Sequence, residues 1–293
     1  MILTRLLKLG LFVCILSNQA TLQAQQISDD IAPEYGNAPS LSQSTGVTRT
    51  QKEPVAKEFI VVSANPLASK AAFTTLENGG NAIDAMVTVQ TVLGLVEPQS
   101  SGLGGGAFLV YYDAKSNRIT TFDGRETAPV GAPNDLFMSS DTTPMKFFDA
   151  VVGGRSVGTP GTVKLLSEVH QRYGSQAWGA MLMPAIELAT KGFQITPRLA
   201  NAVAKDARYL KRDSEAARYF FPKGKAVQTG DSLKNPAYAR TLGLLAKHGG
   251  DGFYTGDNAK AISDKVRKDS NQGYLSEADL TDYRVIERIA VCS

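Results

Sequence analysis

The chain of 293 residues is poor in the side chains that bind metals and carry redox chemistry, with two cysteines and two histidines. Removal of the N-terminal segment that holds Cys14 would leave Cys292 alone, which excludes an internal disulfide. His170 lies on an expected helix without a matching ligand three or four residues away, and His248 precedes Gly249 at an expected helix end. We therefore expect no metal site, no cofactor and no histidine acting as a catalytic base.

An excess of charge of one sign is also lacking, because 31 basic residues are balanced by 28 acidic ones and the net charge is +3. So small an imbalance gives no reason to expect affinity for nucleic acid or for a membrane surface. The chain does have a hydrophobic content of 43%, which is enough for one large domain with its own core.

Long hydrophobic runs are missing too. The apolar stretch Leu9–Leu16 is shorter than the roughly 20 residues that a helix needs to cross a bilayer. It follows a basic start and precedes the small residue Ala24, which predicts a secretory signal peptide over residues 1–24, export to the periplasm and no permanent membrane anchor. Lipid attachment at Cys14 is the less favoured alternative, because the bulky Val13 stands before it.

Residues 25–57 are rich in Ser, Gln, Pro and Thr without an apolar period, so they predict a flexible linker. We expect the folded domain over residues 58–293. Its first element is predicted to be a short buried strand at Phe59–Ser63, because that segment is rich in β-branched residues.

Helix signals follow this segment. Asn65 and Pro66 predict a helix start, and Gly79–Gly80 predicts its end. Asn81–Asp84 has the spacing of a capping box before a run to Val96 that is apolar almost all round, so we expect a buried second helix. The proline start recurs in the second half of the chain, which we expect to be mostly helical, at Thr159–Pro160, Thr196–Pro197 and Asn235–Pro236.

Between these regions, Ala107–Asp113 and Arg118–Asp123 flank a polar turn and predict a β-hairpin. The preceding segment Ser100–Phe108 formally contains the dinucleotide-binding pattern G-x-G-x-x-A. That pattern needs a strand before it and a helix after it, and the expected order here is the reverse, so nucleotide binding is disfavoured. The glycines either form a tight turn or let another group approach the backbone closely.

Arg125 is the candidate binding residue. It follows the hairpin within Phe122–Pro129, where side chains commonly reach a cleft. Its planar guanidinium can hold a carboxylate through two parallel hydrogen bonds. The alternative from the local sequence is an exposed ion pair with Asp123 or Glu126.

Taken together, the segments Ser101–Phe108 and Asp123–Pro129 resemble the γ-glutamyltranspeptidase family, in its bacterial type. The likeness covers the chain from about Glu58 to its end. Further segments agree in order with the large subunit of that family: Asn78–Ala85, Gly158–Gly161, Pro184–Ala189, Gly192–Phe193, Pro197–Leu199, Asp251–Gly256 and Leu280–Tyr283.

The resemblance implies an α+β fold, the αββα sandwich of N-terminal-nucleophile hydrolases, of which this chain would form the large-subunit part. Family members are zymogens that cleave themselves into two subunits, and the N-terminal threonine of the small subunit attacks the γ-carbonyl of glutathione or another γ-glutamyl compound. The γ-glutamyl group then passes to water or to an amino-acid or peptide acceptor. The resemblance assigns Arg125 to the α-carboxylate of the substrate.

The self-cleavage site of the family, of Thr-Thr-His type, has no counterpart in this sequence, because the pairs Thr74–Thr75, Thr120–Thr121 and Thr142–Thr143 precede Leu, Phe and Pro. We therefore expect a truncated precursor fragment ending at Ser293 that holds the substrate clamp, contains no catalytic residue and is inactive alone. The alternative is a non-catalytic module for γ-glutamyl or other carboxylate ligands that retains only the arginine clamp.

Overall fold

The computed structural model describes residues 56–140 and 142–291. The predicted signal peptide 1–24 and nearly all of the predicted linker 25–57 lie outside the described residues. The chain divides into two units, residues 1–57 and 58–293, and the second unit contains the helices and strands of the described residues.

The first two helices of the described residues begin where the capping signals predict. Helix α2 spans Pro66–Glu77, and the side chain of Asn65 caps it. Helix α3 spans Ala82–Val96, and its capping box is complete: Asn81 caps the first turn while Asp84 accepts a hydrogen bond from the Asn81 backbone. The predicted helices and their N-caps are confirmed, because these signals act within a few residues of the chain.

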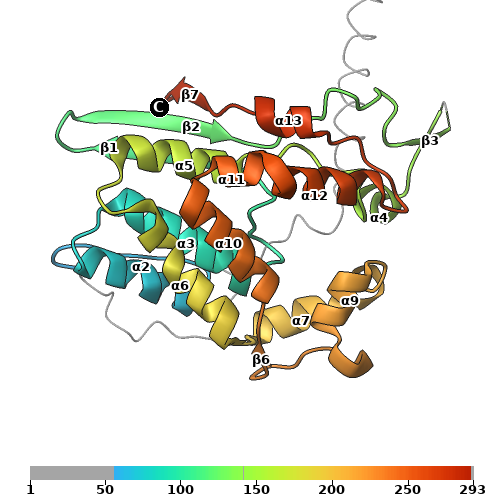
Figure 1. Ribbon diagram of the computed structural model, residues 1–293, viewed down its shortest axis with the longest axis horizontal. Helices are drawn as coiled ribbons and strands as arrows, with labels where there is room; N and C mark the ends of the chain where they lie inside the picture. The colour runs from blue at the N-terminus through green and yellow to red at the C-terminus, as the bar shows by residue number, and fades with distance from the viewer. Residues whose placement is uncertain (1–55, 141, 292–293) are drawn as a thin grey trace, which may run out of the picture. The chain divides into compact units, whose positions relative to one another are not determined.

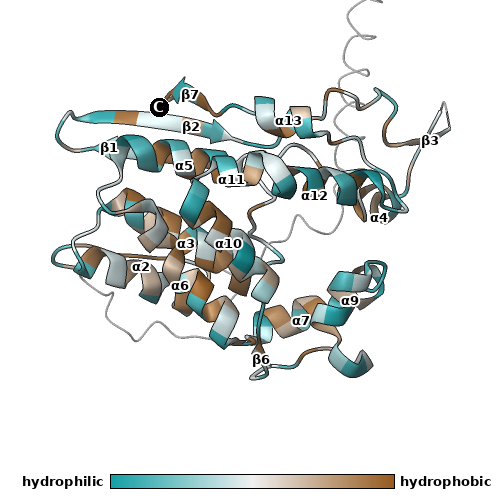
Figure 2. Cartoon of the chain, viewed as in Figure 1, coloured by the Kyte–Doolittle hydropathy of each residue, from teal (hydrophilic) through white to brown (hydrophobic). Residues whose placement is uncertain are grey.

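Helix α3 lies at the centre of the helical core. It packs against α2 on one side and against α6 on another, and α6 in turn packs against α10. Figure 2 shows apolar residues gathered on α3 and its neighbours. The predicted helical second half is confirmed by α4 (Phe147–Val151), α5 (Thr162–Tyr173), α6 (Trp178–Lys191), α7 (Pro197–Lys205), α8 (Ala207–Leu210), α9 (Ser214–Phe220), α10 (Pro236–His248), α11 (Asp251–Tyr254), α12 (Gly256–Arg267) and α13 (Glu277–Asp282).

The predicted hairpin is present as strands β1 (Ala107–Asp113) and β2 (Arg118–Gly124), which pair antiparallel. A late strand, β7 (Ile286–Ile289), joins the free edge of β2 and completes a three-stranded sheet in the order β1-β2-β7. This sheet lies along one side of the helices, next to α5 (Figure 1). The remaining strands form two-stranded pairs: β3 (Met138–Ser140) with β4 (Thr143–Pro144), and β5 (Phe193–Gln194) with β6 (Ser232–Leu233).

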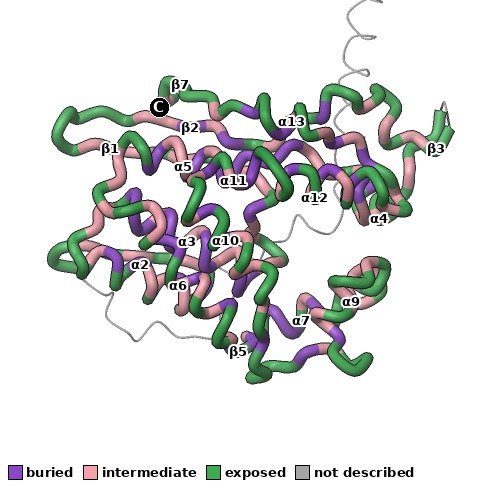
Figure 3. The backbone as a smooth tube through the Cα atoms, in the orientation of Figure 1, coloured by how far each residue is buried: buried purple, intermediate pink, exposed green. Residues whose placement is uncertain are grey.

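The two faces of the three-stranded sheet differ in burial. Tyr111 and Phe122 point to the helical side, where both rings contact Tyr173 of α5. Phe108 and Val110 of β1 point away from the helices and are each 69% exposed. Figure 3 shows buried residues on α3 and α5 and mostly exposed or half-buried residues on the strands.

Two expectations about elements are wrong. Phe59–Ser63 forms no strand, and Ile60 and Val62 are exposed, because no neighbouring strand among the described residues pairs with this segment. Helix α5 begins at Thr162 rather than at Pro160. The residues before it are held in extended form, since Thr159 exchanges two backbone hydrogen bonds with Thr127. Within the described ranges, no helix is both long and apolar enough to cross a bilayer.

Candidate functional site

The end of strand β2 presents Arg125. Its backbone N–H donates to Asp123 Oδ1 at 3.0 Å, which turns the chain directly after the strand. The other carboxylate oxygen of Asp123 accepts from Arg288 of β7 at 2.7 Å. The hydrogen bond from the Arg125 backbone and the bond from Arg288 hold the pKa of Asp123 below its usual value. Asp123 is therefore ionised at neutral pH and is engaged by β7 rather than by the Arg125 side chain.

A second contact fixes the carbonyl of Arg125. The hydroxyl of Tyr283, which is buried, donates to Arg125 O at 2.7 Å. Burial raises the pKa of Tyr283 to about 12, so the hydroxyl keeps its proton at neutral pH. The Tyr283 ring stacks on Tyr254, whose hydroxyl donates to Pro160 O at 2.9 Å. Both backbone groups of Arg125 are thus hydrogen-bonded: its N–H to Asp123 of β2 and its carbonyl to the buried Tyr283.

The glycine segment lies against the same residues. A Cβ at Gly106 would lie 2.8 Å from Arg125 Cα and 2.8 Å from Glu126 N, closer than such atoms approach, so this glycine allows the backbone of Arg125 to pack closely. At Gly104 a Cβ would meet nothing within 4 Å among the described residues. Gly105 O accepts the N–H groups of Gly161 and Thr162 at 3.0 Å. The close approach of another group is therefore shown at Gly106, while the turn at Leu103–Gly104 does not by itself require a glycine.

The helix–turn–strand order around this segment is confirmed, because α3 precedes it and β1 follows it. A dinucleotide-binding loop requires the opposite order, with the following helix directed at the pyrophosphate. The segment therefore lacks the architecture of a nucleotide site.

The guanidinium of Arg125 forms an ion pair with Glu126 at 3.2 Å, and its side chain is 53% exposed. It also lies over the ring of Phe108. The local alternative, an exposed ion pair, is thus present in this structure. Such a pair contributes at most about 1 kcal/mol, so an incoming carboxylate that offers two parallel hydrogen bonds can replace Glu126. The substrate-binding role of Arg125 remains a prediction.

Arg125 and Glu126 line a cavity of about 570 Å³. A second arginine, Arg155, lines it as well, from the loop before α5. Leu136 and Phe137 supply part of the apolar wall. The cavity therefore combines two cations with apolar surface, which suits an anionic ligand with an extended carbon skeleton.

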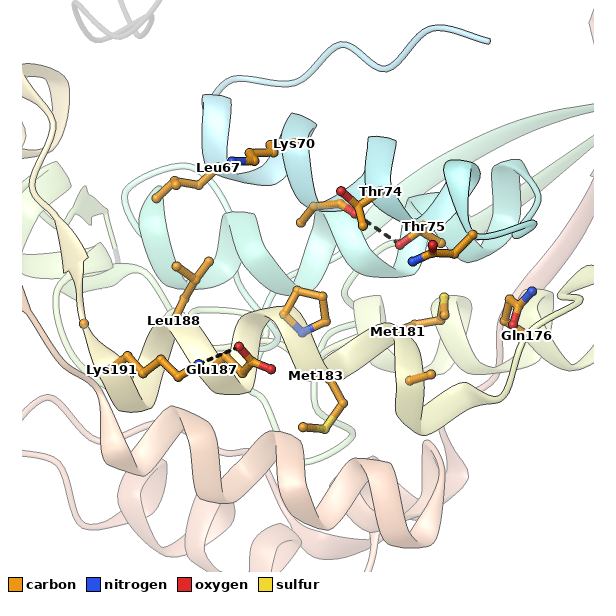
Figure 4. Close-up of a pocket in the computed structure, with 15 residues that line it drawn as sticks. Leu67, Lys70, Thr74, Thr75, Gln176, Met181, Met183, Glu187, Leu188 and Lys191 are labelled. Atoms are coloured by element: carbon orange, nitrogen blue, oxygen red, sulfur yellow. Dashed lines mark hydrogen bonds and ion pairs between the residues drawn. The ribbon is translucent and has the colours of Figure 1, made fainter. Parts of the chain in front are cut away.

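A larger apolar groove of about 620 Å³ lies between α2 and α6 (Figure 4). Leu67 and Lys70 of α2 line one side, and Met183 and Leu188 of α6 line the other. It shares no lining residue with the cavity of Arg125. Because it brings together no nucleophile, base and anion-binding group, we base no functional conclusion on it.

The two histidines differ in burial. His170 is buried against Trp178, and its Nε2 lies 3.1 Å from Asp84 Oδ1 in a direction that does not satisfy hydrogen-bond geometry. His248 is exposed at the C-terminal end of α10. Across residues 56–140 and 142–291, no group of three or more His, Cys, Asp and Glu side chains could hold a metal ion.

Two contributors to this site were missed in the sequence. Tyr283 belongs to the segment Leu280–Tyr283 that resembles the family, but nothing local indicates that its hydroxyl reaches Arg125 O, 158 positions earlier in the chain. Arg155 stands before a glycine–proline segment, a weak signal of a loop residue without information on which cavity it lines.

Comparison with known proteins identifies the fold. The crystal structure of Helicobacter pylori γ-glutamyltranspeptidase matches with a TM-score of 0.76 and 32% identity, over 81% of this chain and 67% of that chain. The glutathione hydrolase proenzyme of Bacillus subtilis strain 168 is 39% identical over 231 residues, which are 79% of this chain and 39% of that protein. The Acylase ACY 1 proenzyme of Pseudomonas sp. strain SE83 is 35% identical over 241 residues, which are 80% of this chain and 43% of that protein.

The mixed helix-and-sheet architecture is therefore that of the N-terminal-nucleophile hydrolases represented by these structures. The family model for gamma-glutamyltranspeptidase matches residues 68–293. The chain belongs to the gamma-glutamyltranspeptidase family. It spans 39% of the length of the Bacillus subtilis relative.

Proposed function

We propose that this chain is the large-subunit part of an exported γ-glutamyltransferase and glutathione hydrolase. The observation that carries the proposal is Arg125, whose backbone is fixed by Asp123 and Tyr283 while its guanidinium stays exposed at a cavity. A fixed backbone and an exposed planar fork, held only by a surface ion pair with Glu126 that a ligand can replace, are suited to bind a substrate carboxylate in one orientation. Arg125 binds the α-carboxylate of the γ-glutamyl group.

In the proposed reaction, the N-terminal threonine of the small subunit, produced from the same precursor, supplies the nucleophile. Its hydroxyl oxygen bonds to the γ-carbonyl carbon, the amide C–N bond breaks, and the hydroxyl proton passes to the departing amine. Water or the amine of an amino acid or peptide then attacks the γ-glutamyl ester and releases the threonine.

Two of the Thr-Thr pairs in this chain lie within regular secondary structure, since Thr75 lies inside α2 and Thr121 inside β2. The 293-residue chain alone is expected to be inactive.

The outer face of the sheet supports the proposed two-subunit assembly. Phe108, Val110 and Tyr112 of β1 are 69%, 69% and 57% exposed, and Ile119 of β2 lies on the same face. Large apolar side chains in a contiguous exposed patch indicate a surface that another element covers. We infer that a sheet of the small subunit packs here, which completes an αββα sandwich.

Export follows from the predicted signal peptide over residues 1–24. The mature chain then begins near Gln25 and acts in the periplasm. The mass of the protein recovered from the periplasm measures this cleavage site directly. A product that retains Met1 in the cytoplasm contradicts the proposed location.

The substitution Arg125→Lys tests the proposed binding role in a precursor extended to the full length of the family. Lysine keeps the charge but loses the planar fork, and losing one charge-assisted contact costs about 1.5–3 kcal/mol, so KM for a γ-glutamyl anilide should rise at least about tenfold. The exposed Arg240 of α10 offers a matched control, and Arg240→Lys should leave the kinetics unchanged.

Unchanged kinetics of the Arg125→Lys enzyme would return Arg125 to the role of a surface ion pair. A wild-type precursor that binds γ-glutamyl compounds but neither cleaves itself nor hydrolyses them would favour the non-catalytic binding module. Hydrolysis of other amides without γ-glutamyl hydrolysis would place the protein closer to its acylase relative in substrate choice.

A further inference from the structure

We propose that Arg155 forms a second carboxylate subsite in the cavity that Arg125 lines. The subsite receives the carboxylate at the C-terminal end of the peptide that leaves a γ-glutamyl peptide, such as the glycine carboxylate of glutathione. This inference rests on the proposed function, because it assigns the other end of the same substrate. It makes Arg155 a specificity-determining residue that separates γ-glutamyl peptides from γ-glutamyl amides without a second negative charge.

The guanidinium of Arg155 is held in a fixed orientation by neutral partners. Its Nε donates to Asn271 Oδ1 at 2.8 Å, and one terminal nitrogen, Nη1, donates to Leu136 O at 2.8 Å. Asn271 is itself anchored, because its Nδ2 donates to the backbone carbonyls of Asp149 and Val152 at 2.8 Å. The plane of the guanidinium is therefore set before any ligand arrives, which lowers the entropy lost on binding.

The charge of Arg155 has no counter-ion in the part of the chain that the structure describes. The nearby carboxylates are engaged elsewhere: Asp149 pairs with Arg212 at 3.6 Å, and Asp269 accepts the backbone N–H of Asn271 at 2.7 Å. The second terminal nitrogen of Arg155, Nη2, donates to no acceptor among the described residues. A half-buried guanidinium with free donors and no carboxylate partner is suited to bind an anion.

The loop that carries Arg155 runs beside the segment that carries Arg125. Thr127 and Thr159 exchange backbone hydrogen bonds of 3.3 and 2.8 Å, and this bridge ties the two segments together. Gly158 lets them approach, because a Cβ there would lie 3.0 Å from Thr127 O. Both arginines line the same cavity of about 570 Å³. The cavity thus presents two separate cations to one ligand, and a γ-glutamyl peptide carries two separate carboxylates.

The competing interpretation is that Arg155 is only a structural link, whose hydrogen bonds hold the loop at Leu136 to the turn at Asn271. A structural link affects stability and would change the kinetics of all substrates to the same extent. A subsite affects only those substrates that carry the second carboxylate. Substrates that differ in this one group therefore separate the two roles.

The test uses the mature two-subunit enzyme obtained from a precursor of full family length. KM and kcat are measured for glutathione, for glutathione with its glycine carboxylate converted to the amide, and for a γ-glutamyl anilide. In the wild-type enzyme, KM should be about tenfold lower for glutathione than for its amide, the effect of one half-exposed charge-assisted contact. Arg155→Gln should abolish this preference and leave KM for the anilide unchanged, while Arg155→Lys should restore part of it.

Arg240→Gln, an exposed arginine on α10, is the matched control and should preserve the preference. Equal KM values for glutathione and its amide in the wild-type enzyme would overturn the subsite, and this comparison needs no variant to fold. An equal loss of kcat/KM for all three substrates in Arg155→Gln would show that Arg155 is only a structural link. If the wild-type enzyme hydrolyses the anilide but does not prefer glutathione over its amide, the subsite is contradicted and the proposed function stands. If the enzyme hydrolyses none of the three substrates, the subsite and the proposed function are both contradicted.

Discussion

The two faces of the sheet β1-β2-β7 contrast sharply in what covers them. On the helical face, Phe122 is 3% exposed, and Leu165 of α5 packs against Gly124. On the opposite face, Phe108 and Val110 are each 69% exposed, although they are as apolar as the residues within. An antiparallel sheet with one wet face normally alternates apolar and polar residues. On the outer face here, the side formed by β1 is apolar, and the polar pair Asp123–Arg288 lies on the side formed by β2 and β7. An exposed apolar strand of this kind is typical of a surface that another element covers.

The contrast extends to the polar groups. Behind the helical face, the carboxylate of Asp84 is fully buried and accepts hydrogen bonds from the backbone of Asn81 and from the backbone and side chain of Ser175. On the outer side, Arg125 forms an exposed ion pair that a ligand can replace. Among the described residues, the carboxylate on the helical side is fully hydrogen-bonded and buried, whereas the outer side leaves apolar side chains and the Arg125 guanidinium exposed. In the proposed function, these exposed groups would meet the small subunit and the substrate.

The largest expected effect is at Gly161, where the sheet, α5 and Tyr283 meet. A Cβ there would lie 2.1 Å from Gly124 O and 2.1 Å from the Tyr283 hydroxyl, and neither atom can move freely. Gly161→Ala should destabilise the fold by about 4 kcal/mol or prevent folding, more than ordinary overpacking. The control is Gly243→Ala in α10, where a Cβ meets nothing within 4 Å and helix propensity should raise stability slightly. Urea unfolding compares the two, and equal stabilities would contradict the packing described for the helical side.

The next effect compares the two faces directly. Leu165→Ala removes a side chain that is 1% exposed and should cost about 3 kcal/mol through lost burial and a cavity. Val110→Ala on the outer face should change the stability of the 293-residue chain by less than about 0.5 kcal/mol. Chemical denaturation of both variants measures the difference. A loss at Val110 as large as that at Leu165 would show that the outer face is already covered in this chain.

A smaller effect depends on pH. Burial alone would raise the pKa of Asp84, but the hydrogen bonds from Ser175, Asn81 and Gln176 together outweigh it and hold the pKa below its usual value. The stability that this group supplies is therefore present above the unfolded-state pKa of about 3.9 and is lost as pH falls through the lower folded-state pKa. Asp84→Asn should cost about 2 kcal/mol at pH 7, since donors lose their acceptor, and less below about pH 4.

Urea unfolding at several pH values from 3 to 7 checks this dependence. The exposed Asp282 provides the control, because Asp282→Asn should show a small and constant difference from the wild type. A cost of Asp84→Asn that grows as the pH falls would reverse the sign of the effect and contradict the role given to these hydrogen bonds.

The sequence predicted those features whose causes lie within a few residues. The caps at Asn65 and Asn81 and the hairpin on either side of residues 114–117 follow from local hydrogen bonds and turn preferences, and the structure confirms them. Arg125 is a candidate because of its planar fork and its place after a strand, and the family resemblance assigns it to the substrate carboxylate. That role stays a prediction.

Features that depend on distant parts of the chain could not be predicted in this way. Phe59–Ser63 has the composition of a strand, but pairing requires a neighbour that the segment itself does not specify. Strand β7 was not predicted, since four residues near the end become a strand only by joining β2. The contacts of Tyr283 and Arg155 likewise join residues more than 100 positions apart.

Thiol labelling of a cysteine placed on the outer face tests most directly whether that face is covered by the rest of the protein. Val110→Cys and, as a control on the exposed hairpin turn, Lys115→Cys are prepared in the 293-residue chain and in a precursor of full family length. Peptide mass spectrometry separates each label from those on Cys14 and Cys292. We predict rapid labelling at both positions in the short chain, and protection at position 110 alone in the full-length protein. Equally rapid labelling at position 110 in both proteins would contradict the account.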